Sequence, residues 1–381
     1  MQLLSLNFLL YTISGLWRPI EWTSKCSKYL YGLYTFTMMY LLIFSVIIQL
    51  MDIILVIDNV DDFTTTSLLF LSDIACFCKA TTIIIRRDKI INLIKTLQEK
   101  PCKPSSEEEI NIQMEYDNLI RTYSINYSLL ASFSCTGVTI GEIFATLQGE
   151  LPYRGWVPYD VHSSLVLFWI TSIQEILAII VGTIMNVATE TLILGFCLQI
   201  CSQLEILKHR FRIAIKSDEE EESPSKNVLY KKSRFSEHIR YHLCIIRFAE
   251  TFNEIFNQVL FMQFSASILV LCTSLYYLSS HITFEDFVKL AVYTLCMFVQ
   301  IFVYCWAGNE VILKSTGLSE AMYEINWTSV TVSEQKDLLI IMKRCTKPIK
   351  FTSTFLVTLS LESYTNILRT SYSAFNVLQQ S

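Results

Sequence analysis

Residues 33–57 read LYTFTMMYLLIFSVIIQLMDIILVI, and this stretch decides the fold class. It contains a single charged residue, Asp52. A bilayer core is crossed by about 20 apolar residues in helical form, because backbone polar groups exposed to lipid would stay unsatisfied. Residues 33–57 therefore predict a transmembrane helix.

Comparable stretches recur along the chain. Apolar runs cover residues 64–85, 123–147, 164–186, 255–279 and 286–307, and a more polar seventh run covers 351–378. Over the whole chain 52% of the residues are hydrophobic and 17% are charged, with a mean hydropathy of +0.41. This composition is too apolar for an ordinary soluble domain. We predict an all-α, multi-pass protein of the cell membrane, with residues 1–381 forming one unit of seven transmembrane helices.

The basic residues lie almost entirely in alternate connectors. Lysines and arginines number 25 in residues 1–32, 86–122, 187–254 and 308–347, whereas the connectors between them contain only Arg154. Connectors rich in these residues stay in the cytosol. The N-terminus is therefore predicted to be cytosolic and the C-terminus extracellular.

The fourth apolar run continues in a helix-like pattern, without proline, from Ser164 to Leu207. Such a helix would be about 66 Å long, roughly twice the thickness of the hydrocarbon core. Residues 235–254 and 308–347 are amphipathic in a similar way. We predict that these helical extensions form a cytosolic anchor domain, with a disordered acidic loop at about 217–227 between two of them.

Motifs for catalysis or cofactor binding are absent from the sequence. It contains no H-E-x-x-H, no G-x-S-x-G and no phosphate-binding glycine loop. The twelve cysteines lie in apolar runs or in predicted cytosolic connectors, which argues against a disulfide framework and a zinc site. The net charge of −5, without basic stripes, argues against a nucleic-acid partner. We predict no enzyme, no cofactor and no metal, and membrane lipids as the surrounding partner.

Ionisable side chains inside a membrane are costly and therefore informative about function. Glu362 belongs to the most polar crossing, where polar side chains recur every three to four residues. This stripe consists of Glu362, Asn366, Arg369, Tyr372 and Asn376. These polar side chains need contact with water or with the same helix of a neighbouring subunit. The stripe therefore predicts a pore to which several subunits each contribute their last helix. The other ionisable residues within the crossings are Asp52, Asp73, Lys79, Glu142 and Glu175. For all of these side chains, pairing inside the helix bundle is the alternative to a place along a cation route.

The outer halves of the predicted crossings combine aromatic rings with a few hydroxyl groups. Such a lining suits a small, mostly apolar ligand. Ordinary packing and an interfacial aromatic belt are the competing interpretation. The candidate ligand-binding residues are Ser67, Phe70, Thr139, Phe144, Phe168, Trp169, Tyr276 and Tyr293.

An ordered set of residues in the last third of the chain carries a resemblance to a known family. It comprises FVYCWAGNE at 302–310, AMY at 321–323, Trp327, MKR at 342–344, KP at 347–348 and SYSAFNVL at 371–378. Upstream, GLWRP at 15–19 and the segments LPY and WVP within 151–158 also fit the pattern. The whole set resembles the insect odorant receptor family.

The resemblance implies a ligand-gated, non-selective cation channel that is opened by small volatile odorants. It also implies a hetero-tetramer with a shared co-receptor subunit and a pore lined by the seventh helix, with Tyr372 and Asn376 at the constriction and Arg369 one turn further inward. A gustatory receptor of the same superfamily is the closest alternative. A G-protein-coupled receptor fits less well because its orientation is inverted, and a transporter fits less well because the chain shows no internal repeat.

Overall fold

The computed structural model describes residues 4–19, 21–57, 59–220, 228–279, 284–323, 332–354 and 357–380, which are almost entirely helical. The elements are α1 (Ser5–Ile13), α2 (Lys25–Leu55), α3 (Val60–Ile85), α4 (Arg87–Gln98), α5 (Glu107–Leu147), the 3₁₀ turn η1 (Val161–Ser163), α6 (Leu165–Glu220), α7 (Val228–Ser279), α8 (Phe284–Tyr323), α9 (Val332–Cys345), β1 (Thr352–Ser353), β2 (Val357–Thr358) and α10 (Leu361–Gln380).

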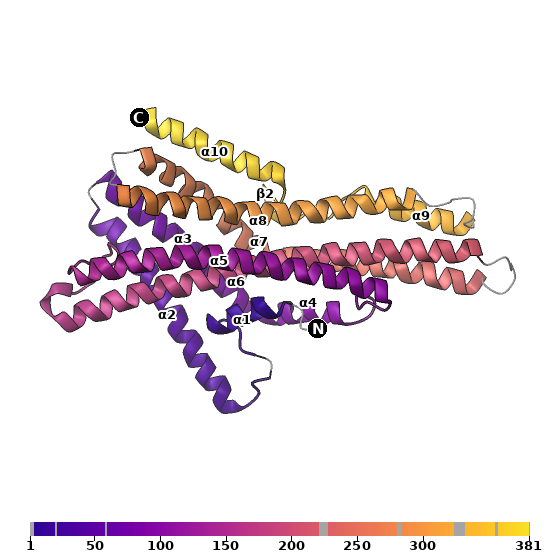
Figure 1. Ribbon diagram of the computed structural model, residues 1–381, viewed down its shortest axis with the longest axis horizontal. Helices are drawn as coiled ribbons and strands as arrows, with labels where there is room; N and C mark the ends of the chain where they lie inside the picture. Colours follow the sequence, from indigo (N-terminus) through magenta and orange to yellow (C-terminus); the bar gives the residue numbers. More distant parts are fainter. Residues whose placement is uncertain are drawn as a thin grey trace.

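The four longest helices, α5 to α8, run along the long axis of the molecule (Figure 1). Helix α6 is the centre of the bundle, because it contacts α1, α2, α3, α5, α7 and α8. Residues 187–204 of this helix are all buried, with Leu192, Phe196 and Ile200 fully enclosed. Burial on every side is the packing expected of a helix that lacks a polar face.

Six described helices are long and apolar enough to cross a membrane, and they contain the first six predicted crossings except for residues 56–57 of the first and residue 164 of the fourth. Helix α6 continues well past the predicted crossing, which confirms the long fourth helix. It ends at Glu220, so residues 217–220 of the predicted acidic loop are helical, and residues 221–227 lie outside the described residues.

The segment before the last helix differs from the prediction. A helix over 351–378 was expected, but residues 352–358 contain the two antiparallel strands β1 and β2, and α10 begins only at Leu361. Phe351 turns inward, where its ring contacts Phe252 with 4.8 Å between centroids, and its carbonyl accepts a hydrogen bond from the Leu359 amide at 2.9 Å. The apolar character that predicted a crossing starting at residue 351 therefore comes partly from Phe351 and Leu359, which are buried in the core.

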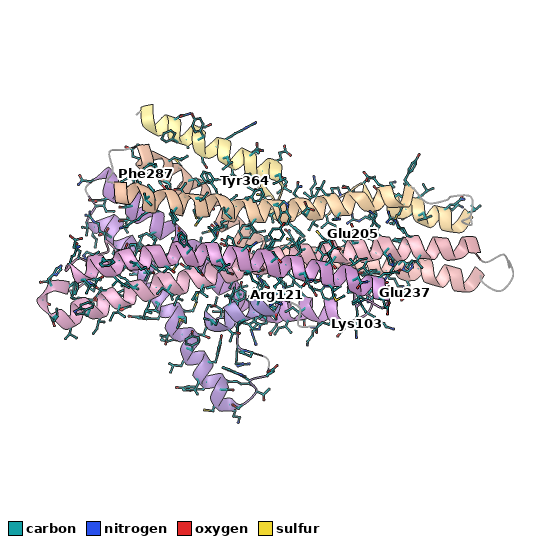
Figure 2. All side chains as sticks on the ribbon, in the orientation of Figure 1. Lys103, Arg121, Glu205, Glu237, Phe287 and Tyr364 are labelled. Atoms are coloured by element: carbon teal, nitrogen blue, oxygen red, sulfur yellow. The ribbon has the colours of Figure 1, made fainter. Side chains whose placement is uncertain are left out.

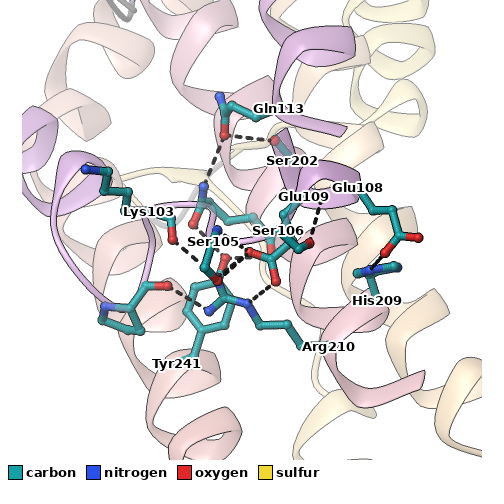
Figure 3. A network of polar contacts seen from close by, with 12 residues as sticks. Lys103, Ser105, Ser106, Glu108, Glu109, Gln113, Ser202, His209, Arg210 and Tyr241 are labelled. Atoms are coloured by element: carbon teal, nitrogen blue, oxygen red, sulfur yellow. Dashed lines mark hydrogen bonds and ion pairs between the residues drawn. The ribbon is translucent and has the colours of Figure 1, made fainter. Parts of the chain in front are cut away.

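At the opposite end from the cavity described below, a guanidinium group holds the loop before α5 against α6 (Figure 3). Arg210 makes a two-pronged ion pair with Glu109, through Nε at 2.9 Å and Nη2 at 2.8 Å. It also donates to the carbonyls of Pro101 and Lys103, and it lies 4.5 Å from the ring centroid of Tyr241. Figure 2 shows Lys103 and Glu237 in this half of the molecule and Phe287 at the other end.

Candidate functional site

A cavity of about 430 Å³ lies between α3, α5, α6, α7 and α8, and the connector before α6 also reaches it. Helices α5, α6 and α8 contribute side chains mostly at three- and four-residue spacing, so one face of each of them lines the space, whereas α7 contributes only Tyr277. On α6 the lining extends from Ile179 to Glu190, a length of about 16 Å along the helix. The cavity is therefore long and follows the helix axes.

The middle of the cavity is largely apolar. Its wall there is formed by Ala131, Val138, Ile179, Leu290 and Met297, together with a few small polar groups. Tyr293 of α8 also lines the wall, and its hydroxyl group is 2.5 Å from the Ser72 hydroxyl of α3. This bond joins the two helices and leaves the aromatic ring of Tyr293 as the surface available to a ligand.

One end of the cavity, which we call the floor, is a buried polar network. Lys79 of α3 donates to Glu190 at 3.0 Å and to Asn186 at 2.8 Å, and both members of the ion pair are 1% exposed. Glu190 also accepts hydrogen bonds from Tyr127 of α5 and Gln300 of α8. The chain runs in opposite directions along α5 and α6, so Tyr127 and Glu190 lie at the same end of the space although they line it from different helices.

The other end of the cavity, which we call the mouth, is covered by the connector between α5 and α6. Tyr153 of this connector lines the cavity, and its amide donates to Glu175 at 3.3 Å. Burial raises the pKa of the Tyr153 phenol well above its usual range, so this group remains neutral. The neighbouring Arg154 forms ion pairs with Asp52, at 3.6 Å, and with Asp62. These contacts hold the connector against α2 and α3.

The predicted ligand-binding residues occupy different places. Tyr293 lines the cavity, whereas Ser67 is buried and donates to the Thr64 carbonyl at 2.9 Å. Phe168 is buried and stacks on His162. The side chains of Phe144 and Trp169 are 61% and 39% exposed, on the outside of the bundle. Phe70, Thr139 and Tyr276 do not line the cavity. Their neighbours in the sequence, Leu69, Val138 and Tyr277, line it instead.

The floor of the cavity was not predicted from the sequence. Lys79 was counted among the costly intramembrane charges, but Glu190 fell within a predicted cytosolic extension. The signal that could have found the pair is the uncompensated charge of Lys79, because a buried cation requires an anionic partner. No spacing rule identifies that partner, which belongs to another helix 111 residues away.

The predicted pore residues all lie on α10, and most of their surface faces away from the rest of the chain. Glu362, Asn366, Arg369 and Tyr372 are exposed, and Asn376 is half-buried. The opposite face packs on the bundle through Ile367 and Ser371, which are buried, and through Tyr364, whose ring lies 5.6 Å from that of Phe302. Figure 1 shows α10 on the outside of the helix bundle. The polar stripe is thus a continuous surface that this chain leaves uncovered.

Other intramembrane acids have partners within the chain. Asp73 accepts hydrogen bonds from Ser45 at 2.5 Å and from Gln49 at 3.0 Å. Asp52 accepts a hydrogen bond from Thr66 at 3.3 Å in addition to its ion pair with Arg154. Within the described ranges, no group of three potential metal ligands comes together. All twelve cysteines are free thiols.

Comparison with known proteins decides the family. Residues 59–372 match the family model described as 7tm odorant receptor, which is most of the chain. The chain belongs to the odorant receptor family.

Curated relatives agree with this assignment. Odorant receptor Or1 of Anopheles gambiae is 22% identical over an alignment that covers 100% of this chain and 94% of that protein. Odorant receptor 13a of Drosophila melanogaster is 25% identical and covers 80% of this chain and 76% of its own length. The solved structure of the insect olfactory receptor OR5 from Machilis hrabei in complex with eugenol has a TM-score of 0.83 at 15% identity, covering 99% of this chain and 97% of that one. The receptor therefore shares the fold of OR5.

Family membership carries several further conclusions. As an odorant receptor with six helices suited to crossing a membrane, the chain is a multi-pass membrane protein. Its relatives are receptors and not enzymes. Among the alternatives left open by the sequence, the family match favours the odorant receptor over a gustatory receptor, a G-protein-coupled receptor or a transporter.

Proposed function

We propose that this odorant receptor is a subunit of a ligand-gated, non-selective cation channel. A small volatile ligand would bind in the cavity between α3, α5, α6, α7 and α8. The volume of about 430 Å³ and the apolar middle wall support this assignment, because small-molecule sites are largely apolar spaces of about 300–1,000 Å³ with a few polar groups.

The observation that carries the channel proposal is the uncovered polar stripe of α10. A helix with Glu362, Asn366 and Arg369 exposed on one face cannot present that face to lipid at low cost. Water in a pore, surrounded by the equivalent helices of other subunits, satisfies these groups. The pore would then lie on the symmetry axis of a tetramer that includes a co-receptor subunit.

The channel proposal is tested by electrical recording from cells that express the chain with a co-receptor. A panel of volatiles should evoke a non-selective cation current that persists after G-protein blockade. A current abolished by that blockade would contradict the proposal.

Two substitutions separate the pore from the cavity. Tyr372→Ala removes an exposed aromatic ring from the stripe and should change the reversal potential or the gating of the current. Tyr293→Ala removes a ring from the cavity wall and should raise the half-maximal ligand concentration about tenfold at an unchanged reversal potential. Trp169→Ala, at a position outside the cavity lining, serves as the comparison for Tyr293→Ala. If Tyr372→Ala left conduction and gating unchanged, α10 would not line the pore.

A further inference from the structure

The floor of the cavity is the most unusual chemical feature of this receptor. A lysine and a glutamate, each 1% exposed, are joined there by Tyr127, Asn186 and Gln300 from three other positions around the space. The network continues to α7, because the Gln263 side chain donates to the side-chain oxygen Oε1 of Gln300 at 3.0 Å. A buried ion pair is often no more stabilising than apolar residues of the same volume. Its position at the end of a ligand-sized space therefore calls for a role in binding.

The hydrogen-bonding capacity of the floor is not fully used. A carboxylate offers about four acceptor positions, and Glu190 uses three of them, for Lys79, Gln300 and Tyr127. One position on the oxygen bonded to Tyr127 is left. Glu190 lines the cavity, so this position is within reach of a bound molecule.

Asn186 supplies the complementary group. Lys79 can only donate, so its contact at 2.8 Å identifies the Asn186 oxygen and directs the amide nitrogen elsewhere. Among the described residues, the two N–H groups of this nitrogen have no acceptor, and Asn186 also lines the cavity. Asn186 and Glu190 are four residues apart on α6 and therefore adjacent on the same helix face. The floor thus presents one donor beside one acceptor.

We propose that the cavity selects small apolar alcohols and phenols, with the ligand hydroxyl group bound between Asn186 and Glu190. This inference rests on the proposed ligand-binding role of the cavity. A hydroxyl group donates and accepts at once, so it can donate to Glu190 and accept from Asn186. An ether or a carbonyl compound only accepts, which leaves the Glu190 position empty and places oxygen lone pairs near a carboxylate. An ammonium group would face the charge of Lys79. The apolar middle wall then holds the hydrocarbon part of the ligand.

The test compares isomers that differ only in the hydroxyl group. The purified full-length chain in lipid nanodiscs is titrated with 1-octanol and its isomer 1-methoxyheptane, and with 2-phenylethanol and its isomer benzyl methyl ether. Bound ligand raises the unfolding temperature. A hydrogen bond to a charged group should give at least one of the alcohols half its maximal effect at a concentration about tenfold or more below that of its ether isomer.

Two substitutions on the floor should shift this preference in opposite directions. In Glu190→Gln, Lys79 and Gln300 hold the remaining side-chain oxygen, and an amide N–H replaces the oxygen that would accept from the ligand. The ratio of the half-maximal concentrations of ether and alcohol should then fall close to one. Asn186→Asp keeps an oxygen for Lys79 but removes the amide donor, so the ether loses its partner and the ratio should increase. Thr136→Ala, which removes a hydroxyl group at an exposed position of α5 outside the cavity lining, is the control and should leave the ratio unchanged. If Glu190→Gln fails to fold, Asn186→Asp carries the test.

Equal potency of both isomers in both pairs would overturn the proposal, as would a lack of stabilisation by either alcohol. A ratio that Asn186→Asp leaves unchanged would overturn it as well. The unfolding temperature is measured on the purified chain and involves no recording of current. These outcomes are therefore independent of channel activity. Alcohol-selective binding without an evoked current would contradict the channel proposal alone.

Discussion

At the residue scale, the pair formed by Lys79 and Glu190 joins the floor of the cavity to the surrounding helices. The two residues belong to α3 and α6, and their partners extend the network to α5 and α8. Removing one member leaves the other as an uncompensated charge in a buried site, which typically costs about 3–5 kcal/mol.

Lys79→Met should therefore lower the free energy of unfolding by about 3–5 kcal/mol, visible as a large drop in the unfolding temperature of the purified chain. The double substitution Lys79→Met with Glu190→Leu should recover much of this loss, because an apolar pair of similar volume replaces the ions. Lys89→Met is the control, since Lys89 and Glu254 pair at the surface with 50% and 61% of their side chains exposed, and it should change little. Wild-type stability of Lys79→Met would show that the ion pair does not form.

At the element scale, the position of α10 depends on the close approach of α8 to the hairpin before it. Gly308 lies in the middle of α8, and a Cβ atom added there would be 2.6 Å from the Leu359 carbonyl oxygen and closer still to the Leu359 Cβ. The absence of a side chain at this position is what allows the backbone of the hairpin to lie against the helix.

Gly308→Ala should force the hairpin away from α8, lower the free energy of unfolding by about 1–3 kcal/mol and disturb α10. The effect can be measured as a lower unfolding temperature together with faster amide hydrogen exchange in residues 351–371. Gly317→Ala is the control on the same helix, because no atom lies within 4 Å of its added Cβ. That substitution should instead stabilise the helix by about 0.5–1 kcal/mol. Equal effects of the two substitutions would argue against close packing at Leu359.

The loop before α5 depends on a different contact, the guanidinium group of Arg210. Arg210→Lys keeps the charge but cannot reproduce the two-pronged pair with Glu109 together with the bonds to two carbonyls. We expect a loss of about 1–3 kcal/mol and faster amide exchange in residues 99–106. Arg247→Lys, at an exposed position on α7, should have little effect. Unchanged exchange in the loop of Arg210→Lys would show that other contacts hold it.

At the scale of the whole molecule, the charge distribution predicts which face of the membrane each connector occupies. The half of the bundle that contains Arg210 carries the connectors rich in lysine and arginine. The cavity mouth lies beside the connector 148–163, whose only lysine or arginine is Arg154. The cavity mouth would then face the outside, where a volatile ligand arrives. The ion pair between Arg210 and Glu109 would lie in the cytosol.

An epitope tag placed after Ser381 should be accessible to antibody on intact cells, and one placed before Met1 only after permeabilisation. The physical reason is the cost of moving lysine and arginine side chains across lipid. Staining of the C-terminal tag that required permeabilisation would reverse the orientation and with it the assignment of mouth and floor.

Much of this fold follows from local properties of the sequence. The first six crossings lie in helices, because a run of about 20 apolar residues has no other stable backbone conformation in lipid. The extension of α6 beyond the crossing was predictable from an apolar pattern without proline, although the helix ends at Glu220 and not at Leu207. The hairpin at 352–358 was not, because the burial of Phe351 and Leu359 depends on α7 and α8, which are distant in the sequence.

By itself, the sequence determined the approximate bounds of the first six apolar helices, the polar stripe on α10 and the pattern that marks the family, because each of these depends on neighbours along the chain. Only the tertiary structure decided that Tyr293 lines a cavity while Trp169 lies outside it, and that Lys79 pairs with Glu190. Helical periodicity states which residues share a face, but it does not state which face meets which helix. Those contacts depend on the packing of helices far apart in the chain, and the floor of the cavity exists only where five of them meet.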